Sequence, residues 1–138
     1  MTDITQAQAD PQTIKGVIPY LDMGGKALEA AAFYEKAFDA KMVGHVPGQS
    51  AGRVAHCQIE INGGTLMMTD HRDVPAEREG FHLQIVAADA QARWDRAVEA
   101  GCEVVMPFEI QFWGDRWGLI RDPFGVQWAF NEAAACGE

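Results

Sequence analysis

The sequence has little of three things: cysteine, positive charge and long hydrophobic runs. Its three cysteines are an odd number and form no CxxC pair, which argues against a disulfide framework and a zinc knuckle. Eleven Lys and Arg residues face twenty Asp and Glu residues, giving a net charge of −9, which opposes binding to a nucleic-acid backbone. No apolar run approaches the roughly 20 residues that cross a bilayer, and no basic segment followed by an apolar one opens the chain. We therefore expect a soluble, cytoplasmic protein that binds neither nucleic acid nor membrane.

What the sequence does contain is enough apolar material for one core. It has 138 residues, of which 48% are hydrophobic, and this length and composition are typical of one globular domain. The first residues are polar and aperiodic, and those after Asn131 are mostly small. We predict a single domain over residues 14–132, with flexible tails at 1–13 and 133–138.

The second half of the sequence repeats the first about sixty residues later. Segment 34–40 (YEKAFDA) aligns with 94–100 (WDRAVEA), residue type by residue type. The glycines of segment 62–64 (NGG) align with the turn at 122–125 (DPFG), and an apolar run follows each. A repeat of this size indicates one supersecondary unit used twice, and it favours a ligand cleft between two similar halves.

Each half shows the same order of predicted elements: a strand, a helix and three strands. The first half has a strand at 16–22, an amphipathic helix at 26–40, and strands at 42–46, 54–61 and 65–69. The second half has a strand at 81–86, a helix at 88–100 that Gly101 stops, and strands at 103–108, 116–121 and 126–130. A polar segment at 70–80 predicts a linker. The fold class is α+β, with tandem βαβββ modules at 14–70 and 80–132.

Paired βαβββ modules with Asp122-Pro123-Phe124-Gly125 before the last strand resemble the vicinal oxygen chelate superfamily, which includes glyoxalases, bleomycin-resistance proteins and extradiol dioxygenases. The segments at 18–21 (IPYL), 33–34 (FY) and 113–118 (WGDRWG) further resemble its PhnB-like branch. The resemblance covers residues 14–131. It implies a curled eight-stranded mixed sheet that forms an open cup, and relatives usually form homodimers.

The resemblance also implies where a divalent metal would bind, because enzymes of the superfamily use His or Glu from the first and last strands of both modules. One ligand position falls on His82, and the others fall on segment 16–18, on Met67 or Met68, and on Ala129. One imidazole does not replace the three or four protein ligands of a catalytic metal. We therefore predict no metal and no other cofactor.

A rearranged metal site is the alternative. His56, Asp70 and His82 lie on or beside different predicted strands, and the PhnB-like branch tends to carry His and Asp at the first two positions. Lone histidines, however, are more often satisfied by a neighbouring side chain than by an ion.

The predicted strand at 54–61 has one polar face, formed by His56, Gln58 and Glu60. This face either lines the cup or meets water or a partner subunit. If it lines the cup, His56 and Glu60 are candidates for acid–base chemistry, because a partly dry cleft shifts pKa values towards neutrality.

The segment at 113–117 (WGDRW) combines indoles with an acid and a guanidinium. It is either a pocket wall, in which Arg116 grips a carboxylate or phosphate, or a structural clasp between Asp115 and Arg116 with the tryptophans in the core. The candidate ligand-binding residues of the whole chain are His56, Gln58, Asp70, His82, Trp113, Arg116 and Trp128.

Three functions fit this sequence. The leading hypothesis is a PhnB-like protein that binds a small organic molecule in the cup without the metal, with catalysis left open. The second is a metal-dependent lyase, isomerase or dioxygenase with a site rearranged around His82. The third is an antibiotic-sequestering protein like the bleomycin-resistance proteins, since an acidic cleft suits a cationic glycopeptide. The expected partners are the small-molecule ligand and a second copy of the chain.

Overall fold

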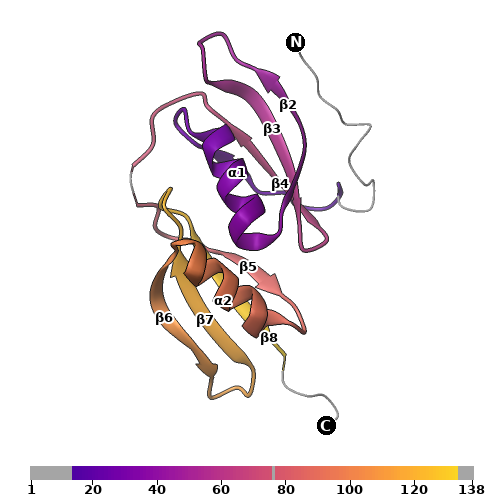
Figure 1. Ribbon diagram of the computed structural model, residues 1–138, viewed down its shortest axis with the longest axis vertical. Coiled ribbons are helices and arrows are strands. Elements are labelled where there is room, and N and C mark those ends of the chain that lie inside the picture. Colours follow the sequence, from indigo (N-terminus) through magenta and orange to yellow (C-terminus); the bar gives the residue numbers. More distant parts are fainter. Residues whose placement is uncertain (1–13, 76, 134–138) are drawn as a thin grey trace. The chain divides into compact units, whose positions relative to one another are not determined.

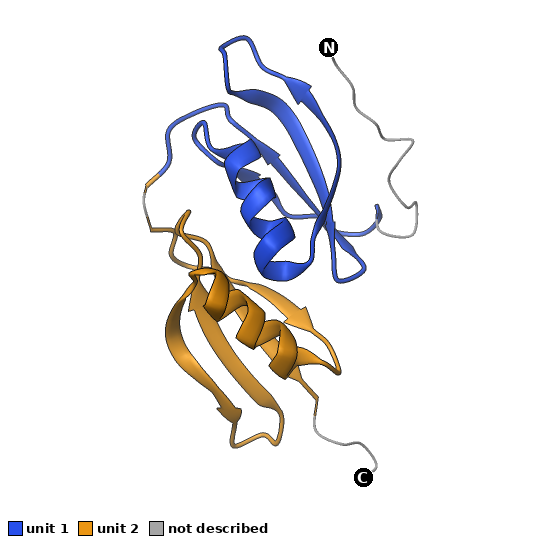
Figure 2. Cartoon of the chain, viewed as in Figure 1, with its two compact units in different colours: residues 1–74 blue, residues 75–138 orange. Residues whose placement is uncertain are grey.

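The computed structural model describes residues 14–75 and 77–133 (Figure 1). The chain divides into two compact units, residues 1–74 and 75–138 (Figure 2), and the border lies inside the predicted linker at 70–80. The predicted tails at 1–13 and 133–138 lie outside the described residues, apart from residue 133. In the described part of the chain, each unit contains one helix and one sheet of four strands.

The first unit has the order β1, α1, β2, β3, β4. The elements are β1 (Tyr20–Asp22), α1 (Ala27–Phe38), β2 (Lys41–Pro47), β3 (Val54–Ile61) and β4 (Gly64–Thr69). The strands lie side by side in the order β1-β4-β3-β2. The pair β1 and β4 is parallel, and the other neighbours are antiparallel.

The second unit has the same topology. Its elements are β5 (Leu83–Val86), α2 (Ala90–Ala100), β6 (Glu103–Ile110), β7 (Arg116–Arg121) and β8 (Gln127–Glu132), and the sheet order is β5-β8-β7-β6. The α+β class and the repeated βαβββ module are therefore confirmed. The eight strands of the predicted mixed sheet are hydrogen-bonded as two sheets of four.

Each helix covers one face of its own sheet, as the apolar spacing predicts. Helix α1 packs on β2 and β3 and buries Tyr34 and Phe38, whose rings stack with centroids 5.4 Å apart. Helix α2 packs on β6 and β8 and buries Ala90, Trp94 and Ala97. Because the described residues of each unit form a single helix, the sheet has a second face that this helix does not cover.

The turns form where the sequence predicts them. Asn62 and Gly63 have φ values of 49° and 79°, and positive φ at both positions is what a type I′ hairpin requires. Helix α2 ends at Ala100, and Gly101 follows it with φ at 121° and its N–H bonded to the carbonyls of Ala97 and Val98. At the end of α1, Asp39 adopts a left-handed conformation with φ at 60°.

The first and last strands differ most from their predicted bounds. Strand β1 begins at Tyr20 instead of residue 16, because Gly16 has a φ of 73° and Pro19 has no N–H to donate. Strand β8 continues two residues beyond the predicted end, since Asn131 pairs with Val86 of β5 and with Trp117 of β7. Neither described helix is long and apolar enough to span a membrane.

Candidate functional site

The open face of the first sheet carries a hydrogen-bonded row of Tyr20, His56 and Gln58. The Tyr20 hydroxyl lies 2.7 Å from His56 Nδ1, and His56 Nε2 lies 3.3 Å from Gln58 Oε1. An amide oxygen only accepts, so Nε2 donates in this bond, and in the neutral imidazole with that tautomer Nδ1 accepts from the Tyr20 hydroxyl. Tyr20 belongs to β1 and His56 to β3, so the row crosses β4.

Exposure increases along this row from Gln58 to Tyr20. Gln58 is 1% exposed, His56 is half-buried and Tyr20 is 53% exposed. Burial raises the pKa of the Tyr20 phenol, so the hydroxyl remains protonated at neutral pH. Tyr20 is therefore the most exposed residue of this row, and its hydroxyl and Gln58 hold the His56 ring from both sides.

The second sheet carries a series of aromatic side chains, which we call the aromatic row: His82, Trp117, Trp113 and Phe112. Neighbouring ring centroids are 6.0, 6.3 and 4.9 Å apart in that order, each pair in an edge-to-face arrangement. Trp113 is 48% exposed and Phe112 is 96% exposed. Exposed aromatic surface of this kind is typical of sites that bind apolar parts of a ligand.

Each unit has a side-chain hydrogen bond that joins two strands of its own sheet, and the two bonds occupy equivalent positions. In the second sheet the Trp117 indole N–H donates to Gln84 Oε1 at 3.0 Å, so β5 is bridged to β7 across β8. The bridge between Tyr20 and His56 joins the first and third strands of its module across β4 in the same register. The sequence repeat thus extends to a repeated side-chain contact on the open face of each sheet.

Two predicted ligand-binding residues lie away from the aromatic row. The Arg116 guanidinium lies 5.9 Å from the centre of the Phe108 ring, which stacks on Trp94 of α2, so Arg116 is on the helix-covered side. Trp128 is 2% exposed, and its indole N–H donates to Asp122 Oδ2 at 2.9 Å. The structure therefore brings His82 and Trp113 together through Trp117 and places Arg116 and Trp128 elsewhere.

Asp70 stabilises the start of helix α1. Its carboxylate accepts hydrogen bonds from the N–H groups of Gly25 and Ala27 at 2.8 and 3.1 Å and from that of Val54 at 3.0 Å. The first two lie at the N-terminus of α1, where a negative charge is stabilised by the unpaired amides and the helix dipole. Asp70 thus caps α1 from the end of β4 and is only 6% exposed.

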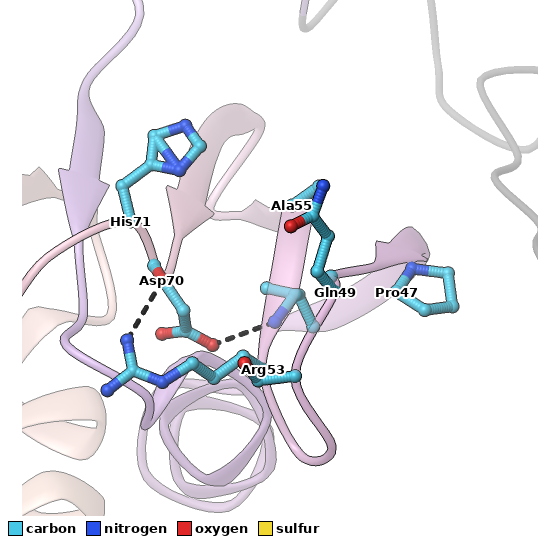
Figure 3. A pocket seen from close by; sticks show the side chains of 9 residues that line it. Pro47, Gln49, Arg53, Ala55, Asp70 and His71 are labelled. Carbon is cyan, nitrogen blue, oxygen red and sulfur yellow. Dashed lines mark hydrogen bonds between the residues drawn. The ribbon is translucent and has the colours of Figure 1, made fainter.

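A pocket of about 570 Å³ opens beside Asp70 in the first unit (Figure 3). It is formed by the loop between β2 and β3 together with the residues that follow β4. The Arg53 guanidinium lies in its wall and donates to the Asp70 carbonyl at 3.1 Å. The lining residues are Pro47, Gly48, Gln49, Ser50, Arg53, Val54, Ala55, Asp70 and His71.

Two of the positions at which the resemblance places metal ligands carry side chains without a nitrogen or oxygen donor: Met67 or Met68, and Ala129. Met67 lies between Tyr20 and Gln58 in the register of its sheet, and Ala129 lies between Gln84 and Leu119. A thioether is a soft ligand and a methyl group has no donor atom. Among residues 14–75 and 77–133, no three His, Cys, Asp or Glu side chains gather where they could hold a metal ion.

The two described cysteines, Cys57 and Cys102, are buried free thiols. Burial, together with the nearby carboxylates of Asp70 and Glu35, raises the pKa of the Cys57 thiol to about 12. Burial, with the Asp122 carboxylate, also raises that of Cys102 to about 12. Neither thiol is therefore a nucleophile at neutral pH. Cys136 lies outside the described residues.

Sequence reasoning missed Tyr20, Gln84 and Arg53 as site residues. The first two occupy matching positions in the first strands of the modules, so the repeat contained a signal for them once strand register is known. Trp117 belongs to the motif at 113–118, and successive residues of β7 point to opposite faces of the sheet. The hydrogen bond to Gln84 shows that Trp117, and not Arg116, lies on the open face.

Comparison with known proteins agrees with this architecture. The model of the Glyoxalase/Bleomycin resistance protein/Dioxygenase superfamily matches residues 24–130, and the chain belongs to this superfamily. The family predicted from the sequence is therefore confirmed.

Its relatives come from distant organisms. Uncharacterized protein Mb0911c of Mycobacterium bovis is 38% identical over 118 residues, covering 77% of this chain and 76% of the relative. Protein YjdN of Escherichia coli is 25% identical over 135 residues, covering 82% and 92%. A solved structure from Bacillus cereus, described as a PhnB protein and putative 3-demethylubiquinone-9 3-methyltransferase, shares the fold. It has a TM-score of 0.68 and 21% identity over 84% of this chain and 98% of that one.

Proposed function

We propose that this chain is a PhnB-like small-molecule-binding protein whose ligand, held in the cup predicted from the sequence, contains a planar apolar ring. The proposal includes no metal and no covalent step. The observation that supports it is the aromatic row, because it gives the second sheet a series of rings that ends in the exposed Trp113 and Phe112.

The contacts around the aromatic row favour ring recognition over anion recognition. The edge-to-face arrangement leaves ring faces for stacking, and an indole face attracts a cation. The net charge of −9 raises the local concentration of cations, and Arg116 lies on the other side of its sheet with Phe108. A neutral or cationic ring is therefore the preferred ligand class.

Calorimetric titration with N-methylquinolinium, a planar cation, tests this function. The wild-type protein should bind it more tightly than cyclohexylammonium, which has the charge without the flat ring. Trp113→Ala should weaken binding about threefold to thirtyfold, the range of one stacking or cation–π contact. Trp113→Phe should restore most of the affinity, because it keeps an aromatic ring.

Arg116→Gln is the matched comparison, since it changes a residue of the same segment on the helix-covered side. Its affinity for N-methylquinolinium should equal that of the wild type. The proposal fails if neither cation binds, or if Arg116→Gln and Trp113→Ala weaken binding equally. The metal-dependent alternative requires close to one zinc, nickel or iron per purified chain, lost on His82→Ala, in elemental analysis.

A further inference from the structure

We propose that the pocket beside Asp70 is a separate binding site for a small organic carboxylate, with Arg53 as the residue that holds its carboxylate group. The site lies wholly within the first unit and shares no residue with the aromatic row. An experiment can therefore support or refute this site independently of the function proposed above.

The pocket is formed by a loop whose backbone is closed by its own hydrogen bonds. The Gly48 N–H donates to the Arg53 carbonyl at 2.8 Å, and the Arg53 N–H donates to the Ser50 carbonyl at 3.1 Å. A β-carbon at Gly48 would lie 3.1 Å from the Arg53 carbonyl oxygen, which shows how closely the two sides of the loop approach. A volume of about 570 Å³ falls within the usual range for small-molecule sites.

The Asp70 carboxylate already has hydrogen-bond partners inside the protein. Its carboxylate is occupied by the amides of Gly25, Ala27 and Val54, and the dipole of α1 offsets its charge. Arg53 contacts the backbone carbonyl of Asp70 rather than its carboxylate. The Arg53 guanidinium therefore does not form its hydrogen bond with the buried Asp70 carboxylate.

The Arg53 guanidinium already forms an ion pair with a carboxylate on the protein surface. The carboxylate of Asp73 lies 3.5 Å from Arg53 Nη2, and the Asp73 side chain is 96% exposed. Such exposed ion pairs contribute little to stability, so a ligand carboxylate inside the pocket can replace Asp73. A guanidinium has five N–H donors in a planar fork, and the contacts of Arg53 with Asp70, Gly24 and Asp73 use two of its three nitrogens.

The remaining polar side chains of the pocket suit a carboxylate that also carries a hydroxyl or amide group. Figure 3 shows His71 on one side of the pocket and Gln49 on the other, with Asp70 and Arg53 along a third side. Ser50 adds a hydroxyl to the lining. These groups offer both donors and acceptors around the position of the guanidinium.

Titration of the ¹⁵N-labelled full chain with lactate, acetate and inorganic phosphate, followed by amide chemical shifts, tests the site. Lactate should give saturable shifts at Gly48, Ser50, Arg53 and His71, and it should bind more tightly than acetate. Arg53→Gln should weaken lactate binding about tenfold to a hundredfold, as expected for hydrogen bonds to a charged group. Asp73→Asn should strengthen binding, because it removes the competing carboxylate.

Arg72→Gln is the charge-matched control, because Arg72 is 82% exposed, pairs with Asp22 and lies outside the pocket lining. It should leave lactate binding unchanged. Dispersed spectra establish that each variant is folded. If Arg53→Gln does not fold, the effect of Asp73→Asn on lactate binding still tests the site. The assignment is overturned if lactate causes no saturable shift at the pocket amides, if phosphate alone binds, if Arg72→Gln acts like Arg53→Gln, or if Asp73→Asn weakens binding.

Discussion

At the scale of single residues, neighbours in the sequence have separate tasks. Asp70 and Asp73 are three positions apart, yet one carboxylate is 6% exposed and accepts three backbone hydrogen bonds, whereas the other side chain is 96% exposed. Arg116 and Trp117 are adjacent, yet one contacts Phe108 and the other belongs to the aromatic row. Burial and strand alternation, rather than residue type, decide which of them stabilises the fold and which is presented to a ligand.

Asp70→Asn should lower the free energy of unfolding by about 2–4 kcal/mol. An amide offers one acceptor oxygen where the carboxylate has two, and it removes the negative charge from the N-terminus of α1. Asp73→Asn is the matched control and should change stability by less than about 0.5 kcal/mol, as surface substitutions usually do. Urea unfolding of both variants measures the difference, and equal stabilities would contradict the capping role.

At the scale of secondary-structure elements, the β7 backbone at Gly118 lies so close to the backbone of Phe108 in β6 and to the Trp94 ring of α2 that only glycine fits there. A β-carbon at Gly118 would lie 2.7 Å from Phe108 Cα and 2.8 Å from Trp94 Cζ3, distances that real contacts essentially never show. The indole of Trp94 is packed between Phe108 and Phe130, with centroids 5.4 and 5.7 Å away. The close approach of the β7 backbone therefore allows this aromatic core to form.

Gly118→Ala should destabilise the protein by about 1–3 kcal/mol or more, because overpacking forces the backbone of β6 or the Trp94 ring to move. Gly64→Ala is the control in a strand of the other unit. There, the nearest atom to an added β-carbon is the Ile61 carbonyl oxygen at 3.6 Å, so stability should change little or rise slightly. Melting temperatures of the two variants decide the matter, and similar values would show that Gly118 does not limit the packing.

The elements that the sequence predicted best are those with strong local signals. Strands β3 and β7 have their predicted bounds, and the hairpin at Asn62 and Gly63 forms as expected. The helices start and end within about two residues of prediction. The limits of β1 and β8 depend on partners far along the chain, such as the pairing of Asn131 with Val86, and periodicity within a segment contains no information about them.

The same distinction holds for the candidate site. His56 and Gln58 are identified from strand alternation, Trp113 from the motif that contains it and His82 from the family resemblance, and the structure places them on or beside the open faces of their sheets. Tyr20 meets His56 across 36 positions of sequence, and the pocket of Arg53 is closed by residues after β4. Such contacts are set by sheet order, which no single segment specifies.

At the scale of the whole molecule, strand β6 has an exposed apolar surface. It is an edge strand of its sheet, and four of its apolar side chains are between 38% and 66% exposed: Val104, Val105, Met106 and Ile110. Register shifts interrupt its pairing with β7, and Pro107 lies in its middle. Proline and bulges oppose the addition of another strand to an edge, so a partner would contact this surface through side chains.

We propose that a second copy of the chain covers this surface, and we expect sedimentation at tens of micromolar to show a species of twice the 15.1 kDa chain mass. Ile110→Glu should shift the protein to the single-chain mass, because a charge at a 66% exposed apolar position is costly only when a partner buries it. Val17→Glu is the control, since Val17 is 99% exposed in the other unit, and it should remain dimeric. A wild-type protein that sediments as a single chain would refute the dimer. A dimer that tolerates Ile110→Glu would show that the copies associate through another surface.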